Sequence, residues 1–246
     1  MNHPALRLAV VFAALAVLGS MTTLLGAAPI RADPVRANDP SIPPVERANL
    51  HQLVFANDDL AILNNVYPPH SDSGYHRHGH PLFYVVVDPA HFGAQLLGRA
   101  LVIPPMAPAG STGYNLMPDG PITHRVVNGD RRTCHIIAIE LLRPAPSGHA
   151  ASDRAPVYVQ LFDNERMRAW RLILPPGASA PAVRQGDAGV RVVVRGGTLV
   201  TARPGLPDQT LALTKGDFAV QQAVGEERSR RNAGAMVIEL VEMELK

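Results

Sequence analysis

The chain has 246 residues, of which 46% are hydrophobic and 18% are charged. Such a composition is typical of a globular protein with one large or two small cores, and it excludes a largely disordered chain. The formal net charge is +2, without a long Lys/Arg block, so no nucleic-acid partner is expected. The single cysteine, Cys134, excludes an internal disulfide and any CxxC metal or redox pair.

The N-terminal segment resembles an export signal. No charged residue occurs from Leu8 to Ala28, His3 and Arg7 precede this run, and small residues close it. A run of about 20 apolar residues can also span a bilayer, so an uncleaved anchor fits as well. We therefore expect residues 1–32 to be a signal peptide or membrane anchor, and the rest of the chain to fold in the periplasm or outside the cell.

Two segments rich in proline and polar residues divide the remaining chain. Residues 33–47 are predicted to be a leader, and residues 144–156 a linker, because neither has much potential for helix or strand. They separate residues 48–143 from residues 157–246. Each of these stretches has the length of a small domain, so two domains are predicted.

Both stretches contain short runs of apolar and β-branched residues bounded by Gly, Pro, Asn and Asp. The clearest runs are 82–88, 135–142, 191–202 and 236–245. Runs of this length and composition predict strands, and no segment after residue 32 shows sustained helical periodicity. The fold class predicted is all-β, a sandwich or a barrel.

The two stretches also repeat each other. Pro68-Pro69, His76 and His78 recur 107 positions later as Pro175-Pro176, Val183 and Gln185, and His124 and Asn128 recur 104 positions later as Arg228 and Asn232. A difference of three residues in loop length explains the two offsets. The strands that follow contain Ile139-Glu140-Leu141 and Ile238-Glu239-Leu240, and we matched Glu140 with Glu239 as structural residues on that basis.

These motifs resemble those of the cupin superfamily. Its first motif contains a glycine, HxH and a following carboxylate, and its second contains PxG followed by HxxxN; here they correspond to Gly74, His76 and His78, then to Pro118-Asp119-Gly120, His124 and Asn128. The resemblance covers residues 48–246 if the second half is a degenerate copy. It implies two tandem jelly-roll barrels, in a protein similar to the bicupins.

The histidines can be assessed apart from the resemblance. On a strand, His76 and His78 point to the same side, so both imidazoles can enter one interior, where His124 from a neighbouring strand could join them. Three imidazoles suit a divalent transition metal such as Fe, Mn, Zn or Ni and leave positions open for water or substrate. The alternative is a solvated, histidine-rich turn.

The chain departs from the family pattern at one ligand. The carboxylate of the first motif would fall at position 82 or 83, where Leu82 and Phe83 stand instead. A three-histidine iron site similar to that of the thiol dioxygenase branch of cupins remains compatible with this loss. We predict that His76, His78 and His124 bind the metal.

Several other residues are candidates for the pocket around the metal. These are His80, at the mouth of the pocket or behind the ligands, the hydroxyl groups of Tyr75, Tyr84 and Tyr114, and Asn128 of the HxxxN motif. For each tyrosine, packing or a turn is the alternative role.

The second repeat has Val183, Gln185 and Arg228 at the three ligand positions, so it is predicted to be free of metal and to serve a structural role. An inward-facing Arg228 would require an anionic partner, so this half could instead recognise a carboxylate or phosphate, with Arg184 and Arg191 in support. Exposure, or pairing with nearby acidic residues, is the alternative.

Two functions fit these observations. The first is an exported, metal-dependent oxidoreductase of the dioxygenase type that acts on a small organic molecule. The second is a non-enzymatic protein of the cell envelope that binds or senses a small ligand. A homodimer is also expected, both from the habit of the fold that the resemblance implies and from the strongly apolar C-terminal strand.

Overall fold

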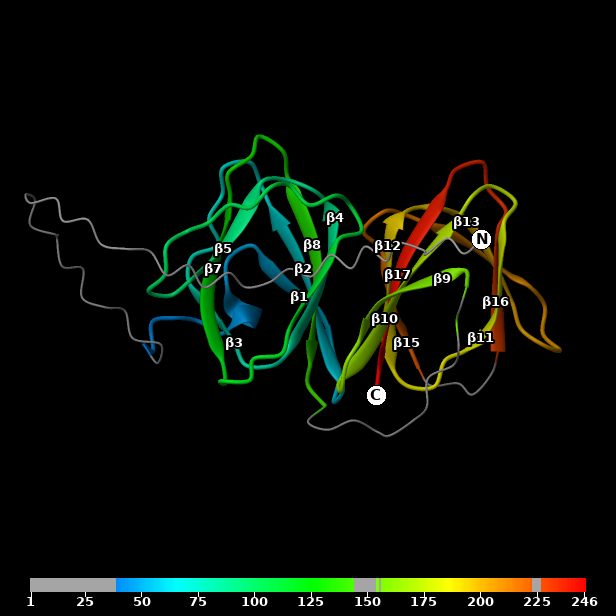
Figure 1. Cartoon of the computed structure of the whole chain (residues 1–246), viewed down its shortest axis with the longest axis horizontal. Helices are drawn as coiled ribbons and strands as arrows, with labels where there is room; N and C mark the ends of the chain where they lie inside the picture. The colour runs from blue at the N-terminus through cyan, green and yellow to red at the C-terminus, as the bar shows by residue number, and fades with distance from the viewer. Residues whose placement is uncertain (1–38, 144–153, 155, 223–226) are drawn as a thin grey trace, which may run out of the picture. The chain divides into compact units, whose positions relative to one another are not determined.

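The computed structural model describes residues 39–143, 154, 156–222 and 227–246. The predicted signal peptide or anchor at 1–32 and nearly all of the predicted linker lie outside these residues. Among the described residues, no helix is both long and apolar enough to cross a membrane. Apart from one 3-10 turn, the regular structure of the described chain is entirely β (Figure 1).

The first repeat forms two sheets. Its elements are the 3-10 turn η1 (Val45–Arg47) and the strands β1 (His51–Ala56), β2 (Leu60–Tyr67), β3 (His76–His78), β4 (Leu82–Asp88), β5 (Phe92–Leu96), β6 (Thr112–Asn115), β7 (Ile122–Asn128) and β8 (Cys134–Leu141). One sheet has the order β1-β2-β8-β4-β6 and the other the order β3-β7-β5. From β2 onward, consecutive strands therefore alternate between the two sheets, which enclose a common interior.

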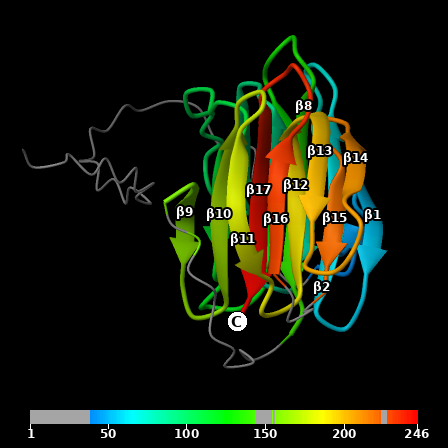
Figure 2. The same ribbon diagram turned by 90° about the vertical axis from the view of Figure 1, so that its right-hand side faces the viewer.

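The second repeat has the same plan. Its strands are β9 (Tyr158–Asp163), β10 (Met167–Leu174), β11 (Ser179–Arg184), β12 (Gly189–Arg195), β13 (Gly197–Ala202), β14 (Gln209–Leu213), β15 (Phe218–Gln221), β16 (Glu227–Asn232) and β17 (Ile238–Leu245). The sheets have the orders β15-β12-β17-β10-β9 and β11-β16-β13-β14. In Figure 2 this repeat faces the viewer.

The apolar runs in the sequence correspond to real strands. The run 82–88 coincides with β4, and the runs 135–142 and 236–245 contain most of β8 and β17. The run 191–202 was predicted as one strand but forms two, β12 and β13, separated at Gly196. At this glycine a Cβ atom would lie only 2.2 Å from the carbonyl oxygen of Leu213, so the backbone bends where no side chain fits.

Alternate residues of β4 show why its run is apolar on both faces. Leu82 and Tyr84 pack inside the first repeat, whereas Phe83 and Val85 belong to a core cluster that also contains Val192 of the second repeat. The five-stranded sheets therefore cover each other through one shared core. The second repeat thus covers the apolar face of the first.

The C-terminal strand β17 is central in its sheet and buried along its whole length. Its apolar residues Val241, Met243 and Leu245 pack in the shared core within the chain. The apolar character that led us to expect a homodimer is therefore accounted for inside one chain.

Strand pairing confirms the internal repeat and corrects one match. His76 pairs with His124 in the first repeat as Val183 pairs with Arg228 in the second. Leu82 pairs with Glu140, and its counterpart Gly189 pairs with Glu244. The counterpart of Glu140 is therefore Glu244, and the match with Glu239 was wrong because the Ile-Glu-Leu motif occurs five residues earlier on β17 than the register requires.

The predicted leader is partly integrated into the first repeat. Ile42 and Val45 are buried, Val45 packs on Leu63, and Pro44 forms an isolated bridge with Arg77 beside the HxH motif. Residues 39–47 thus close one end of the interior. Proline-rich composition alone did not predict this packing.

Candidate metal centre

Four histidines meet in the interior of the first repeat. His76 and His78 project from β3, and His124, paired with His76 across the strands, projects from the neighbouring β7. The ring centroids lie 5.2 Å apart for His76 and His78, 4.6 Å for His76 and His124, and 4.9 Å for His78 and His124. The fourth ring, that of His51 on β1, lies 4.2 Å from His76.

The turn before β3 orients the first of these rings. Gly74 has a φ of 69°, a left-handed conformation that favours glycine, and its N–H donates a hydrogen bond to Asp72. Its carbonyl accepts a bond of 3.0 Å from Nδ1 of His76. Nδ1 of His76 therefore carries the proton, and the lone pair of its Nε2 faces the cluster.

The second ring is held by a carboxylate. Nδ1 of His78 lies 2.9 Å from Oε1 of Glu140, and both side chains are almost fully buried. Histidines that bind metal commonly donate their other N–H to such a carboxylate, which fixes the tautomer. Because Glu140 pairs with Leu82 across the strands, a carboxylate does stand beside the expected ligand position. This carboxylate accepts a hydrogen bond from His78 and so orients its ring. We had predicted only a structural role for Glu140, without this contact.

Burial keeps three imidazoles of the cluster, those of His51, His76 and His124, in the neutral form. Burial lowers the pKa of His76 to about 2, with the nearby imidazoles of His51 and His124 lowering it further, because a positive charge on one ring opposes charge on the next. Burial likewise lowers the pKa of His124 to about 3 and that of His51 to about 4. Neutral imidazole is the form that binds metal.

His51 was not among the predicted ligands. Its Nδ1 lies 2.8 Å from the carbonyl of Asn49, and its Nε2 lies 3.0 Å from the hydroxyl of Tyr67. Since the carbonyl can only accept, Nδ1 donates to it and Nε2 accepts from Tyr67. A signal was available: the 107-residue offset also matches Phe55 with Phe162, and thus His51 with buried Tyr158 at the start of β9.

The donor set fits a transition metal. Ligand atoms of His51, His76 and His78 lie within 4.8 Å of one another, and all three residues are buried. Nε2 of His76 and Nε2 of His124 are buried without a hydrogen-bond partner. A buried nitrogen without a partner costs free energy of folding, and an ion between these two nitrogens would serve as a partner for both. The first repeat therefore contains a buried histidine triad that fits metal binding, with His124 beside it.

Two other residues predicted for the pocket, Asn128 and His80, lie in different environments. Asn128 is fully buried, but its Nδ2 donates to the carbonyls of Tyr67, Pro68 and Arg132, and its Oδ1 accepts from the N–H of Asp130. It ties β7 to neighbouring loops. His80 lies beyond the end of β3 and is exposed, so it is placed outside the interior.

The three tyrosines lie in different environments. The ring of Tyr75 packs under the guanidinium of Arg125, at 5.4 Å. Tyr114 packs on the core shared by the two repeats, with its ring centroid 6.4 Å from that of Phe162. Tyr84 packs against two core clusters inside the first repeat, and burial raises the pKa of its hydroxyl.

The second repeat has no such histidine cluster among its described residues. The strand register aligns His51, His76, His78, His124 and Glu140 with Tyr158, Val183, Gln185, Arg228 and Glu244. Its interior contains ion pairs instead. Arg154, from the predicted linker, contacts Glu242 at 2.8 Å and Glu244 at 2.5 Å and stacks on Trp170.

Arg228, the predicted anion-binding residue, lines a cavity in this interior together with Arg191. Arg184, which we expected in support, is exposed on β11.

Comparison with solved structures shows the same architecture in other proteins. AerE from Microcystis aeruginosa aligns with 81% of this chain and 98% of its own, at a TM-score of 0.54 and 11% identity. A salicylate 1,2-dioxygenase from Pseudaminobacter salicylatoxidans aligns over 81% of this chain and 76% of its own, at 0.53 and 15%. Protein Ylba from E. coli aligns over 76% and 77%, at 0.54 and 12%. No family model and no curated relative matches the sequence.

Proposed function

The chain has the cupin fold, as its histidine and PxG motifs indicated, and from this premise we propose that its first repeat is a jelly-roll barrel that binds one divalent transition metal. The proposed ligands are His76, His78 and His124, with His51 as a fourth. The observation that carries the proposal is the pair of buried Nε2 atoms, on His76 and His124, that lack a partner beside two further imidazoles. The second repeat is proposed to be a metal-free barrel of the same type.

The surrounding residues are suited to hold these ligands in place. Glu140 keeps the proton of His78 on Nδ1, and the carbonyl of Gly74 does the same for His76, so both Nε2 lone pairs face inward. The hydroxyl of Tyr67 competes for Nε2 of His51, so this ligand would exchange a hydrogen bond for the ion. A bound Fe, Mn, Zn or Ni ion would supply a Lewis acid with open positions for a small organic molecule.

We propose an oxygenase-type reaction on that molecule. The support is the histidine set together with the fold shared with a salicylate 1,2-dioxygenase, whose structure has also been solved as adducts with gentisate. Small thiols and hydroxylated aromatic acids are the first substrates to assay, by oxygen consumption of the iron-loaded protein.

The metal site itself is tested by metal content. The purified chain is loaded separately with Fe(II), Mn(II), Zn(II) and Ni(II), dialysed and analysed by mass spectrometry, beside the single variants His76→Ala, His78→Ala, His124→Ala and His51→Ala. We expect a near-stoichiometric ion that is lost in the first three variants and held more weakly in the fourth. His80→Ala, at an exposed site outside the interior, is the control and should retain the ion. Failure of the unaltered chain to retain any ion would overturn the proposal.

A second candidate is a non-enzymatic protein that binds or senses a small ligand. It is favoured by the hydrogen bond from Tyr67 to His51, which satisfies one of the four imidazoles without an ion. In that case the metal-loaded chain would bind small molecules without turnover. Oxygen consumption above that of the His76→Ala variant would exclude this candidate.

We also propose that the protein is exported and forms a homodimer. The uncharged run from Leu8 to Ala28 supports export. Cell fractionation followed by sequencing of the mature N-terminus would distinguish a soluble periplasmic or extracellular protein from an anchored one. Light scattering of the purified protein would test the dimer.

A further inference from the structure

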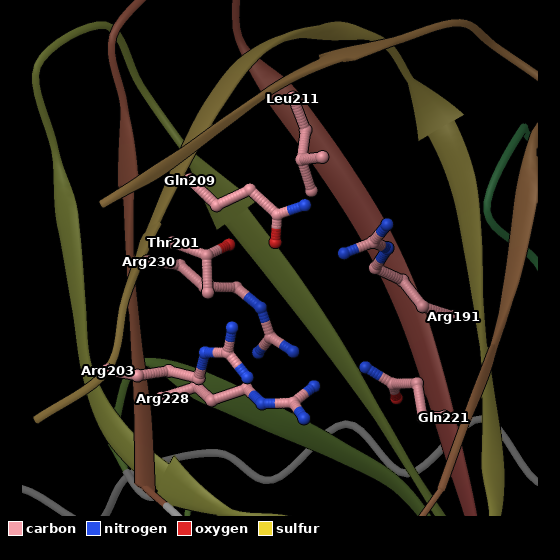
Figure 3. Close-up of a pocket in the computed structure, with 8 residues that line it drawn as sticks. All are labelled: Arg191, Thr201, Arg203, Gln209, Leu211, Gln221, Arg228 and Arg230. Atoms are coloured by element: carbon pink, nitrogen blue, oxygen red, sulfur yellow. The ribbon is translucent and has the colours of Figure 1, made fainter. Parts of the chain in front are cut away.

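The interior of the second repeat contains a cavity of about 170 Å³. Its lining residues are Arg191, Thr201, Arg203, Gln209, Leu211, Gln221, Arg228 and Arg230. They come from both sheets: Arg191 and Gln221 from the five-stranded sheet, and Thr201 and Arg230 from the four-stranded one. Figure 3 shows three guanidinium groups converging from one side toward Arg191 and Gln221 on the other. Among these eight described residues, four are arginines and none is acidic.

Two of these arginines, Arg191 and Arg230, occupy positions that pack in an apolar cluster of the first repeat. The strand register aligns Arg191 with Tyr84 and Arg230 with Val126, both of which pack in the apolar interior of the first repeat. Burial of a guanidinium costs free energy unless an anion compensates it. The second interior has therefore acquired positive charge that its fold does not require.

The carboxylates nearby are already engaged. Glu242 contacts Arg154 and also Arg230, at 2.8 Å in each case, and Glu244 contacts Arg154. The hydroxyl of Tyr158 is a further partner of Arg230. These contacts hold the guanidinium of Arg230 in place on the cavity wall.

Arg191 has no such partner. Within the described part of the chain it makes no hydrogen bond or ion pair, and its Nε is buried without an acceptor. Burial lowers the pKa of Arg191, and Arg230 and Arg228 lower it further, against the opposing effect of the carboxylates of Glu242 and Asp217. A charge that is destabilised in this way would be stabilised by an anion in the cavity.

Two neutral groups on the wall also lack partners. Gln221 is only 7% exposed, and its Oε1 is buried without a hydrogen bond. The hydroxyl of Thr201, on the opposite sheet, is likewise buried without one. Buried polar groups are normally satisfied by protein, water or ligand, so these two are available to a ligand that donates hydrogen bonds as well as accepting them.

We propose that this cavity binds a small hydroxylated organic anion through Arg191, Arg230 and Gln221, with its carboxylate or phosphate oxygens on the guanidinium groups. A planar guanidinium matches either oxyanion with two parallel hydrogen bonds. The volume lies below the roughly 300–1,000 Å³ of pockets for drug-sized ligands, so the ligand is small. Leu211 is the single apolar residue among the eight, so the ligand is polar along most of its length.

The proposal does not depend on the metal site. The residues involved belong to the second repeat, so anion binding is expected equally in protein treated with EDTA and in metal-loaded protein. Loss of one function would leave the other testable.

Calorimetric titration and thermal denaturation of the purified chain test the proposal. The probes are malate, succinate and inorganic phosphate, and the reference is sodium chloride at equal ionic strength. The variant is Arg191→Gln. The control is Arg195→Gln on the same strand, where Arg195 is exposed and faces Glu239 at 3.2 Å. We expect saturable binding with malate tightest, a loss of about 10- to 100-fold in Arg191→Gln, and no change in Arg195→Gln.

A purely structural role for Arg191 predicts a different result. Without ligand, Arg191→Gln should melt at the same temperature as the unaltered protein or higher, because it removes a buried charge without a partner. A structural arginine would lower the melting temperature instead. If no probe binds above the chloride reference, or if Arg191→Gln and Arg191→Lys both retain full affinity, the proposal is wrong.

Discussion

At the scale of single residues, the carboxylate of Glu140 is the clearest case of a group that acts through a neighbour. We expect Glu140→Gln to weaken metal binding by about 10- to 100-fold, because the amide cannot replace the negative charge that holds the proton on Nδ1 of His78. Competition with a chelating dye measures the change.

The matched control is Glu239→Gln, whose carboxylate faces Arg171 and Arg195 in the second repeat. It should leave metal affinity unchanged, whatever it does to stability. An equal loss in both variants would mean that Glu140 supports folding and has no specific effect on the ligands.

The buried imidazoles also predict how stability depends on pH. In the folded chain the pKa values of His51, His76 and His124 are about 4, 2 and 3, whereas in the unfolded chain they return to about 6.5. The unfolded state therefore takes up protons first as pH falls below 6.5. Metal-free protein should lose up to about 1.4 kcal/mol per pH unit for each of these histidines between about pH 6.5 and pH 4.5.

Urea denaturation of EDTA-treated protein across this range measures the slope. His135, whose pKa burial also lowers, adds to it in the same direction. The variant His124→Gln should show a shallower slope than the unaltered chain. A free energy of unfolding that stays constant down to pH 4.5 would contradict the neutral, buried cluster.

The site was only partly predictable from sequence, for reasons that differ from residue to residue. His76, His78 and His124 could be found because their spacing along strands places them on one face. His51 could not be found by its spacing from the other histidines, because β1 belongs to the other sheet and reaches the cluster across the interior. Asn128 was assigned to the pocket because it belongs to a ligand motif, yet its hydrogen bonds all go to the backbone.

At the scale of elements, β7 and β16 each end at a buried asparagine whose side chain ties the strand to neighbouring loops. Asn232 is fully buried and donates to the carbonyls of Leu174 and Met236, as Asn128 does to those of its own loops. We predict that Asn128→Ala and Asn232→Ala each lower the free energy of unfolding by about 1–3 kcal/mol, because buried carbonyls lose their donor. Denaturation in urea checks both values.

Metal affinity distinguishes a structural role of Asn128 from a role in the metal site. Asn128→Ala should retain the ion with affinity close to that of Asn232→Ala, in which the change lies in the other repeat. If Asn128→Ala lost the metal and Asn232→Ala did not, Asn128 would have a role in the metal pocket.

The positions of the strands were easier to predict than the register of each strand and the core that each of its faces contacts. The runs that became β4 and β8 are apolar on both faces, so their existence was evident from composition alone. Which face meets which core depends on contacts between residues about 100 positions apart, such as Phe83 with Phe162. The Ile-Glu-Leu motif misled for the same reason, since β17 is apolar enough to fit more than one register.

At the scale of the whole molecule, the shared core predicts that the two repeats unfold together. Trp170, the single tryptophan, is buried in the second repeat, whereas the metal site lies in the first. Metal at about 100 times its dissociation constant stabilises the folded chain by about 2.7 kcal/mol, and the fluorescence of Trp170 should report this as a higher denaturation midpoint. The double variant His76→Ala/His78→Ala should show no such shift. If circular dichroism reports a shift that Trp170 does not, the repeats unfold independently.

The position of β8 and β17 has a consequence for the exchange of amide hydrogens with solvent. Each strand is flanked by two others and buried on both faces, where the five-stranded sheets cover each other. Their amides can reach water only when the whole molecule opens, whereas those at the edges of the sheets exchange through local fraying. When exchange in heavy water is measured by mass spectrometry, the most slowly exchanging peptides should therefore come from these two strands. The part of the protein that opens most slowly would then lie at the boundary between its repeats.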